Sequence, residues 1–315
     1  MNKNKYKEIL TLYELGKVSL NETFDHIVSK SQKEIKSNDT QKEDDETLED
    51  IMAELYNLVG LKNVKKLVKE IIAFIEIQEK RKKNNLLTEP IVLHMIFRGN
   101  PGTGKTTVAR ILGRIFKKIG VLEKGHLVEI ERADLVGEYI GHTALKVKRQ
   151  VKKALGGILF IDEAYSLARG GEKDFGKEAI DALVKSMEDN KDKLILILAG
   201  YEKEMDIFLR TNPGLKSRFP IHIDFKDYTI EELIEIAKIM AKSREYKLSN
   251  KAIKKLETIL KNKNYEYNSG NARLVRNIIE KAIRKQAVRL QKRKYVTRED
   301  LLLLRAEDIG GDDKY

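Results

Sequence analysis

The stretch Gly99-Asn100-Pro101-Gly102-Thr103-Gly104-Lys105-Thr106-Thr107 decides the fold of this chain. An apolar run at 91–97 precedes it and predicts a strand, and the apolar spacing from Val108 onward predicts a helix. Strand, glycine-rich loop, Lys-Thr and helix is the arrangement found in proteins that bind nucleoside triphosphates. The glycines let backbone N–H groups converge on phosphates, and the helix N-terminus adds partial positive charge. We therefore expect this loop to hold a nucleoside triphosphate.

Two residues of the loop have chemical roles of their own. Lys105 is a point charge for the β- and γ-phosphate oxygens, and the Thr106 hydroxyl is a candidate Mg²⁺ ligand. The other candidate cofactor-binding residues of the loop are Pro101, Gly102, Thr103, Gly104 and Thr107.

A second motif follows one strand–helix unit later. Ile158-Leu159-Phe160-Ile161 is an apolar strand that ends in Asp162 and Glu163. At this position Asp162 would hold Mg²⁺ or its water ligands, and Glu163 would orient and deprotonate an attacking water. With Lys105 and Thr106, these carboxylates predict hydrolysis of the nucleotide.

Composition limits the class of protein. The chain has 315 residues, a length typical of about two domains. It has no cysteine, which excludes disulfides and thiol catalysis, and its 5 histidines lack the spacing of a zinc site. Apolar runs fall short of the roughly 18 residues of a membrane span, and no secretory pattern is present, so we expect a cytoplasmic protein. The net charge of +12 is spread over many segments, typical of solvated helices.

The order of elements predicts an α/β fold in which a five-stranded parallel sheet carries helices on both faces. Beyond Asp227 we expect helices only, the first with Thr229 as its N-cap. The expected strands lie at 91–97, 126–131, 157–162, 193–200 and 221–225, with helices at 106–119, 143–155, 177–189 and 202–209.

The same pattern divides the chain into parts. Residues 1–46 are an N-terminal helical segment and polar linker, and 47–226 form the α/β nucleotide-binding subdomain, which begins with helices on either side of Gly60. Residues 227–308 form a helical subdomain, with Ser249, Gly270 and Thr297 between its helices, and 309–315 form a polar tail.

These motifs together resemble the AAA+ ATPases, with 99–107 as the Walker A and 158–163 as the Walker B motif. More narrowly, they resemble the group that contains stage V sporulation protein K and the red-type Rubisco activases, with the sporulation protein the closer likeness. The resemblance covers 47–308. It implies Mg²⁺-dependent hydrolysis of ATP to ADP and phosphate, a helical lid over the nucleotide, and a homo-oligomer for which a hexamer is the family expectation. The segments that carry it, beside the phosphate loop, are 58–61, 133–141, 160–171 and 270–277.

The family pattern adds contacts outside the phosphate loop. Val59-Gly60-Leu61 falls where similar proteins contact adenine. Arg273 falls at the sensor-2 position, where a lid arginine meets the phosphates of its own subunit, and Arg276 on the same helix face is the rival candidate. Arg218 falls where the family places an arginine finger, a catalytic residue that reaches the γ-phosphate of the neighbouring subunit. Tyr201 stands close to the place where many relatives have a polar sensor of the lytic water, so the sensor-1 assignment stays open.

The loop after the second strand contains Glu138-Tyr139-Ile140-Gly141. In an AAA+ ring this loop points into the pore, and the triplet resembles the peptide-gripping loop of protein unfoldases and activases. Tyr139 and Ile140 can grip varied side chains by apolar contact. The alternative is that both are buried under the sheet edge. The glycine-containing loop 169–176 is a candidate second pore loop.

Two function classes follow from the resemblance. In the first, a ring motor remodels a protein client through its pore, in bacterial spore formation. In the second, the motor acts on nucleic acid through basic residues of the last long helix. A pore loop with Tyr-Ile and no lysine favours protein over a phosphate backbone. A nucleotide-gated scaffold without threading is a third possibility. The basic residues of that helix are Lys281, Arg284, Lys285, Arg289, Lys292, Arg293 and Lys294.

Overall fold

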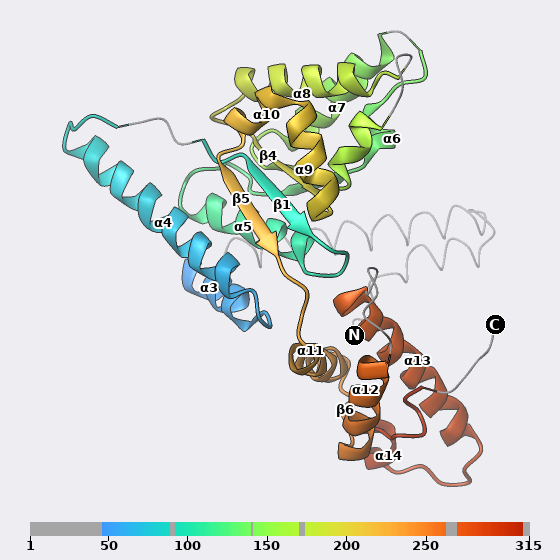
Figure 1. Ribbon diagram of the computed structural model, residues 1–315. Coiled ribbons are helices and arrows are strands. Elements are labelled where there is room, and N and C mark those ends of the chain that lie inside the picture. Colours follow the sequence, from blue (N-terminus) through green and yellow to red (C-terminus); the bar gives the residue numbers. More distant parts are fainter. Residues whose placement is uncertain (1–45, 89–91, 140, 170–173, 263–269, 311–315) are drawn as a thin grey trace, which may run out of the picture. The chain divides into compact units, whose positions relative to one another are not determined.

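The computed structural model describes residues 46–88, 92–139, 141–169, 174–262 and 270–310 (Figure 1). The predicted N-terminal helical segment and most of its linker therefore lie outside the described residues, as do Ile140 and part of the loop 169–176. Two units are distinguished, 1–51 and 52–315, and the site described below belongs to the second unit. Within the described residues no helix combines the length and the apolar character needed to cross a bilayer.

A five-stranded parallel sheet forms the centre of the α/β part, which confirms the predicted fold (Figure 1). Its strand order is β2-β3-β4-β1-β5. Strands β3 and β4 are buried along their whole length, as expected of parallel strands covered on both faces. The strands are β1 (Met95–Gly99), β2 (Leu127–Ile130), β3 (Ile158–Ile161), β4 (Ile195–Gly200) and β5 (Ile221–Phe225).

The first strand starts later and runs further than the predicted 91–97. At its beginning the ring nitrogen Nδ1 of His94 accepts the hydrogen bond of the Leu196 backbone N–H at 3.0 Å, so a side chain stands in for backbone pairing there. At its end Gly99 still pairs with Phe225 of β5. The central strand therefore leads directly into the phosphate loop.

Helices cover both faces of this sheet. Side chains of α7 (His142–Ala154), α8 (Gly176–Asp189) and α9 (Glu202–Thr211) join Leu159 and Ile161 of β3 in one apolar cluster. On the opposite face α5 (Lys105–Lys118) lies against β2 and β3, where Gly113 approaches Ile158. The remaining helices before the lid are α3 (Leu48–Asn57), α4 (Lys62–Lys83), α6 (Arg132–Leu135), α10 (Pro213–Arg218) and the 3₁₀ helix η1 (Ala164–Ala168).

The lid has its own apolar core and begins at the predicted cap. Thr229 and Glu232 form a capping box at the start of the first lid helix. The prediction that no strand follows Asp227 is wrong, because β6 and β7 pair in parallel. Strands of 2 residues are too short to show an alternating pattern in the sequence. The lid elements are α11 (Ile230–Lys242), β6 (Lys247–Leu248), α12 (Asn250–Asn262), α13 (Asn271–Gln291), α14 (Arg298–Leu302) and β7 (Leu303–Leu304).

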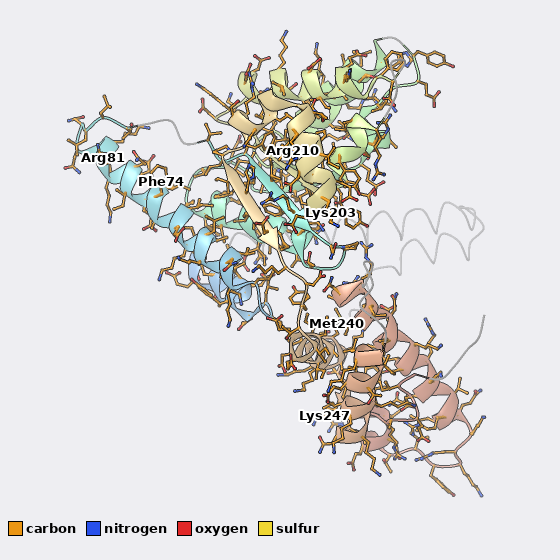
Figure 2. All side chains as sticks on the ribbon, in the orientation of Figure 1. Phe74, Arg81, Lys203, Arg210, Met240 and Lys247 are labelled. Atoms are coloured by element: carbon orange, nitrogen blue, oxygen red, sulfur yellow. The ribbon has the colours of Figure 1, made fainter. Side chains whose placement is uncertain are left out.

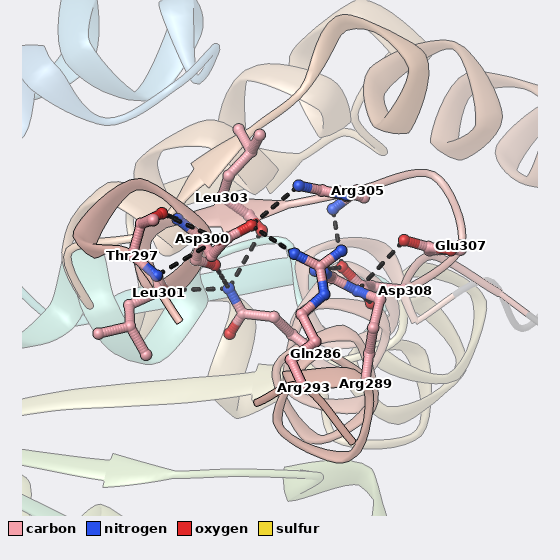
Figure 3. Close-up of polar contacts among 10 residues, drawn as sticks. All are labelled: Gln286, Arg289, Arg293, Thr297, Asp300, Leu301, Leu303, Arg305, Glu307 and Asp308. Atoms are coloured by element: carbon pink, nitrogen blue, oxygen red, sulfur yellow. Dashed lines mark hydrogen bonds and ion pairs between the residues drawn. The ribbon is translucent and has the colours of Figure 1, made fainter. Parts of the chain in front are cut away.

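Polar contacts attach the end of the lid to α13 (Figure 3). The Gln286 amide nitrogen donates to the carbonyl oxygens of Asp300, Leu301 and Leu303 at 3.0–3.1 Å. Arg289 binds the buried carboxylate of Asp308 through two nitrogens, at 2.9 and 2.8 Å. These contacts make the segment 297–310 part of the lid rather than a loose tail.

Candidate nucleotide-binding site

A cavity of about 410 Å³ lies between the phosphate loop, the segment 57–61 and helices α11 and α13 of the lid. This volume is within the range of small-molecule pockets. Most of the predicted nucleotide contacts line it: Val59, Leu61, Pro101, Gly102, Gly104, Lys105, Thr106, Thr107, Asp162, Glu163 and Arg273, with the rival Arg276. Two predicted residues, Gly60 and Thr103, lie beside the wall but do not form it.

The phosphate loop has the backbone that its glycines allow. Gly102 and Gly104 have φ angles of +72° and +98°, in the left-handed region that side chains disfavour. Gly104 is the N-cap of α5, so Lys105 and Thr106 open the helix and its free N–H groups face the cavity. The Lys105 ammonium donates to the carbonyl oxygens of Gly99 and Asn100, at 2.8 and 2.9 Å. Burial lowers the pKa of Lys105, and the nearby charge of Asp162 opposes that fall.

The acidic pair follows β3 at the edge of the same cavity. The Asp162 N–H donates to the carbonyl of Ile130 at 3.0 Å, and the Asp162 carboxylate accepts the Glu163 N–H at 3.0 Å. Glu163 has a φ of +47°, unusual for a residue with a side chain. This turn separates the two carboxylates from the regular strand and places both on the cavity wall.

The donors beside the phosphate loop fit a hard divalent cation. The Thr106 hydroxyl, the Asp162 carboxylate and the Glu163 carboxylate all border the cavity, and oxygen ligands are what Mg²⁺ prefers. The Thr106 hydroxyl donates to Glu129 of β2 at 3.3 Å. The sequence did not predict Glu129 as a neighbour of the site, because a single acidic residue in a strand matches no nucleotide-binding motif.

The other end of the cavity is apolar. Ile236, Ile239 and Met240 of α11 line it together with Leu58 and Val59, and Figure 2 labels Met240. Apolar walls of this kind suit the faces of a purine base. Our sequence reasoning missed the α11 residues, because apolar spacing along a helix does not distinguish a cavity wall from the core; the structure leaves Ile239 45% exposed.

The segment that precedes α4 is held by the residues around it. The Lys65 ammonium donates to the carbonyl oxygens of Tyr56 and Leu58, at 3.0 and 2.5 Å. Gly60 has a φ of +63°, a conformation that favours glycine, and a Cβ there would lie 2.5 Å from the Glu232 carboxylate, which would have to move. Gly60 therefore sets the path of the chain between Val59 and Leu61, which line the cavity.

Arg218 is placed outside the cavity of its own chain. It ends α10, where Nε and Nη2 donate to Oε1 of Glu188 at 2.8 and 2.6 Å and Nη1 donates to the carbonyl of Gly214 at 2.9 Å. Tyr201, by contrast, lines the cavity, with its ring 5.9 Å from that of Tyr165.

Tyr139 is 65% exposed and its ring contacts only the edge of His142 among the described aromatic rings, at 5.4 Å. The alternative that Tyr139 is buried under the sheet edge is therefore wrong. Helix α6, which precedes the loop of Tyr139, is bound to η1, the 3₁₀ helix that follows Asp162 and Glu163. Arg132 of α6 donates to the carbonyl of Ser166 in η1 at 2.5 Å, and it also pairs with Asp174 at 2.6 Å. Ile140 lies outside the described residues.

Comparisons with known proteins agree with this geometry. The family described as "ATPase family associated with various cellular activities (AAA)" matches residues 95–227, and the AAA lid domain matches 229–315. Stage V sporulation protein K of Bacillus subtilis (strain 168) is 56% identical over 84% of this chain and 83% of its own length. The chloroplastic ribulose bisphosphate carboxylase/oxygenase activase of Cyanidioschyzon merolae (strain NIES-3377 / 10D) is 45% identical over 84% of this chain and 90% of its own.

Solved structures share the fold at low sequence identity. A point mutant of RuvB from Thermotoga maritima aligns with a TM-score of 0.51 at 19% identity, over 81% of this chain and 69% of that one. The FIGL-1 AAA domain in complex with ADP aligns with a TM-score of 0.53 at 17% identity, over 80% of each chain. Taken with the cavity and the close relatives, the matched families show that the chain belongs to the AAA+ ATPases: it binds nucleotide and hydrolyses ATP.

Proposed function

We propose that the chain forms a homo-oligomeric ring, by family expectation a hexamer, that hydrolyses ATP to remodel a protein client held by Tyr139 and Ile140 in its pore. The exposed Tyr139 carries the proposal. An aromatic ring 65% exposed on a short loop has no use in the core of the subunit, and it suits apolar contact with a passing polypeptide. The tie from Arg132 to Ser166 gives this loop a mechanical link to the catalytic pair.

Each site residue has a role in this proposal. Lys105 holds the β- and γ-phosphates, Glu163 deprotonates the attacking water, and Arg273 senses the γ-phosphate from the lid. The Mg²⁺ would be held by Thr106 and Asp162 and would neutralise phosphate charge when bound. The loop 57–61 and α11 hold the adenine.

Arg218 supplies charge to the site of the adjacent subunit. Its place outside its own cavity supports this assignment, because a finger that acts between subunits must lie on the surface of the one that provides it. A protein whose name refers to sporulation is 56% identical to this chain, which supports a place in bacterial spore formation.

Nucleic acid is the second candidate, and the lid gives it little support. Arg289 of the basic helix α13 is paired with Asp308, and Arg293, just beyond the end of that helix, is paired with Asp300. Guanidinium groups engaged in this way are not available to neutralise phosphates.

Client capture tests the proposal. In the Glu163→Gln background, which should bind ATP without turning it over, crosslinking should trap a protein in the ring. Adding Tyr139→Ala should abolish the trapped protein while ATP binding persists, because the grip and the nucleotide site are separate. Tyr295→Ala is the matched control, since Tyr295 is 80% exposed on the lid. The nucleic-acid function would instead be established if DNA or RNA stimulated ATP turnover, if added salt weakened this stimulation, and if the Tyr139→Ala variant kept it.

A further inference from the structure

Three segments far apart in the sequence meet at Asp227. The Asn100 amide nitrogen, from the phosphate loop, lies 3.0 and 2.9 Å from the two carboxylate oxygens of Asp227. The Asn271 amide nitrogen, from the first turn of α13, donates to Asp227 Oδ1 at 2.8 Å. Asp227 itself lies in the connection between β5 and the first lid helix. One carboxylate thus joins the phosphate loop, the connection and the lid.

Neighbouring contacts strengthen this junction. Asn271 is fully buried with a φ of +43°, and its amide oxygen accepts the Tyr228 N–H at 3.1 Å. The Tyr228 hydroxyl in turn donates to the carbonyl of Thr103 at 3.1 Å. A buried residue in this backbone conformation persists only where its surroundings hold it. We call Asn100, Thr103, Asp227, Tyr228 and Asn271 the hinge network.

Backbone contacts beside the hinge network place Arg273 against the phosphate loop. The Ala272 N–H donates to the carbonyl of Gly102 at 3.2 Å, and a Cβ on Gly102 would lie 2.3 Å from the carbonyl oxygen of Gly270 and 2.9 Å from the Arg273 nitrogen. The backbone that carries Arg273 therefore rests on the phosphate loop itself. Arg273 follows Asn271 closely in the same helical turn, so a change at Asn271 moves the root of the arginine side chain.

We infer that Asp227 is a positioning residue that fixes Arg273 over the phosphates by tying the N-terminus of α13 to Asn100. Asp227 does not line the cavity, so its role would be exercised through Arg273 and not through contact with the nucleotide. The inference rests on the proposed role of Arg273 as a sensor of the γ-phosphate. Because Asn100 belongs to the phosphate loop, the same carboxylate joins that loop to the helix that carries Arg273.

Nucleotide discrimination tests the inference. The affinities of the full-length chain for ATPγS and for ADP are measured with Mg²⁺ for Asp227→Ala, Asp227→Asn, Arg273→Ala and the Asp227→Ala/Arg273→Ala double variant. Loss of a contact to a charged group corresponds to about a tenfold change in affinity. We expect each single variant to lower the preference for ATPγS over ADP by about tenfold, and the double variant to lower it no further, because both substitutions remove the same contact.

The controls separate positioning from folding. Asp224→Asn is the matched control, because Asp224 lies on β5 near Asp227 and pairs with Arg98 outside the cavity. Asp224→Asn should leave the preference for ATPγS over ADP unchanged. A merely structural role of Asp227 would lower ADP and ATPγS affinities together, and that result overturns the inference. Asp227→Asn keeps the shape of the side chain, so the nucleotide preference can be measured with this variant even if Asp227→Ala does not fold.

The remaining outcomes distinguish the two assignments. If Arg273→Ala lowers the ATPγS preference and the Asp227 variants do not, the positioning role is overturned while the sensor role stands. If Arg273→Ala leaves the preference unchanged, the sensor role fails, and the positioning role fails with it. If the effects of Asp227→Ala and Arg273→Ala multiply in the double variant, Asp227 acts independently of Arg273, which also overturns the inference.

Discussion

His94 combines a buried ring with a hydrogen bond that requires one of its nitrogens to be unprotonated. Its side chain is only 4% exposed, Nδ1 accepts the Leu196 N–H, and the ring of Phe219 lies 5.9 Å away. Burial lowers the pKa of His94 from its ordinary 6.5 to about 4. The folded protein therefore keeps this ring neutral at pH values where the unfolded chain protonates it.

This shift predicts acid sensitivity. Between pH 6.5 and 4 the unfolded state binds more protons at His94 than the folded state, so the stabilisation is complete above pH 6.5 and is lost as pH falls. We expect the unfolding free energy to drop by about 2 kcal/mol between pH 7 and pH 5 from this residue alone. Urea unfolding of the wild type and of His94→Gln, which cannot titrate, measures the difference. Equal pH slopes for the two proteins would contradict the prediction.

At the same scale, the sequence singled out the residues of the two motifs but not the residues around them. Lys105, Thr106, Asp162 and Glu163 belong to motifs that depend on local spacing, and all four line one cavity. Asp227 and the α11 residues were not, since they come into place only when the lid meets the phosphate loop. Contacts between segments more than 100 residues apart leave no periodic pattern in a single sequence.

At the scale of the elements, helix α5 and the segment before β2 approach so closely at Gly113 and Gly125 that neither position has room for a side chain. A Cβ on Gly113 would lie 2.2 Å from the carbonyl oxygen of Gly125, and one on Gly125 would lie 2.4 Å from that of Gly113. This contact sets the distance between the phosphate-loop helix and the start of β2. It is a packing requirement, because Gly113 is buried inside a helix where alanine would otherwise be favoured.

Gly113→Ala is therefore expected to destabilise the protein. Helix propensity alone would stabilise it by about 1 kcal/mol, but the clash with backbone forces α5 to shift, at a cost of about 1–3 kcal/mol, so we expect a net loss of about 1 kcal/mol. Thermal unfolding measures the change. Gly120→Ala is the comparison, because its Cβ would meet open space and only its φ of +79° is unfavourable. An increase in stability for Gly113→Ala would show that the two segments separate freely.

Sequence periodicity predicted the long elements and missed several of the short ones. The five strands and the helices that cover them follow from buried runs and amphipathic spacing. Helices α6 and α10 and the strand pair β6–β7 were missed, because 4, 6 and 2 residues are too few to show a period. Strand β1 begins later than predicted because the His94 side chain, and not its backbone, accepts the hydrogen bond of the Leu196 N–H. The apolar composition of 91–97 gives no sign of this later start.

For the whole molecule, the separation of Arg218 from its own cavity predicts a site shared between subunits. On the proposed roles, Arg218→Ala keeps the base Glu163 and lacks the arginine finger, whereas Glu163→Gln keeps the finger and lacks the base. Each variant alone should be nearly inactive. An equal mixture should recover about a quarter of wild-type turnover, because in a ring of head-to-tail interfaces that fraction joins an intact Glu163 to an intact Arg218.

The measurement is steady-state ATP turnover after the subunits have been dissociated and reassembled together. A mixture of Arg218→Ala with Arg218→Ala/Glu163→Gln is the control, since it contains no finger and should stay inactive. Wild-type turnover by Arg218→Ala as a monomer would exclude a shared site.

The strand order β2-β3-β4-β1-β5 also has a mechanical consequence. Tyr139 follows β2, an edge strand of this sheet whose strand partner among the described residues is β3. A load applied at Tyr139 would enter the sheet at its edge and would be passed first to β3, the strand that Asp162 and Glu163 follow. The phosphate loop, carried by β1, lies two strands further along the same path. Tension on the loop would thus reach Asp162 and Glu163 before it reaches the phosphate loop.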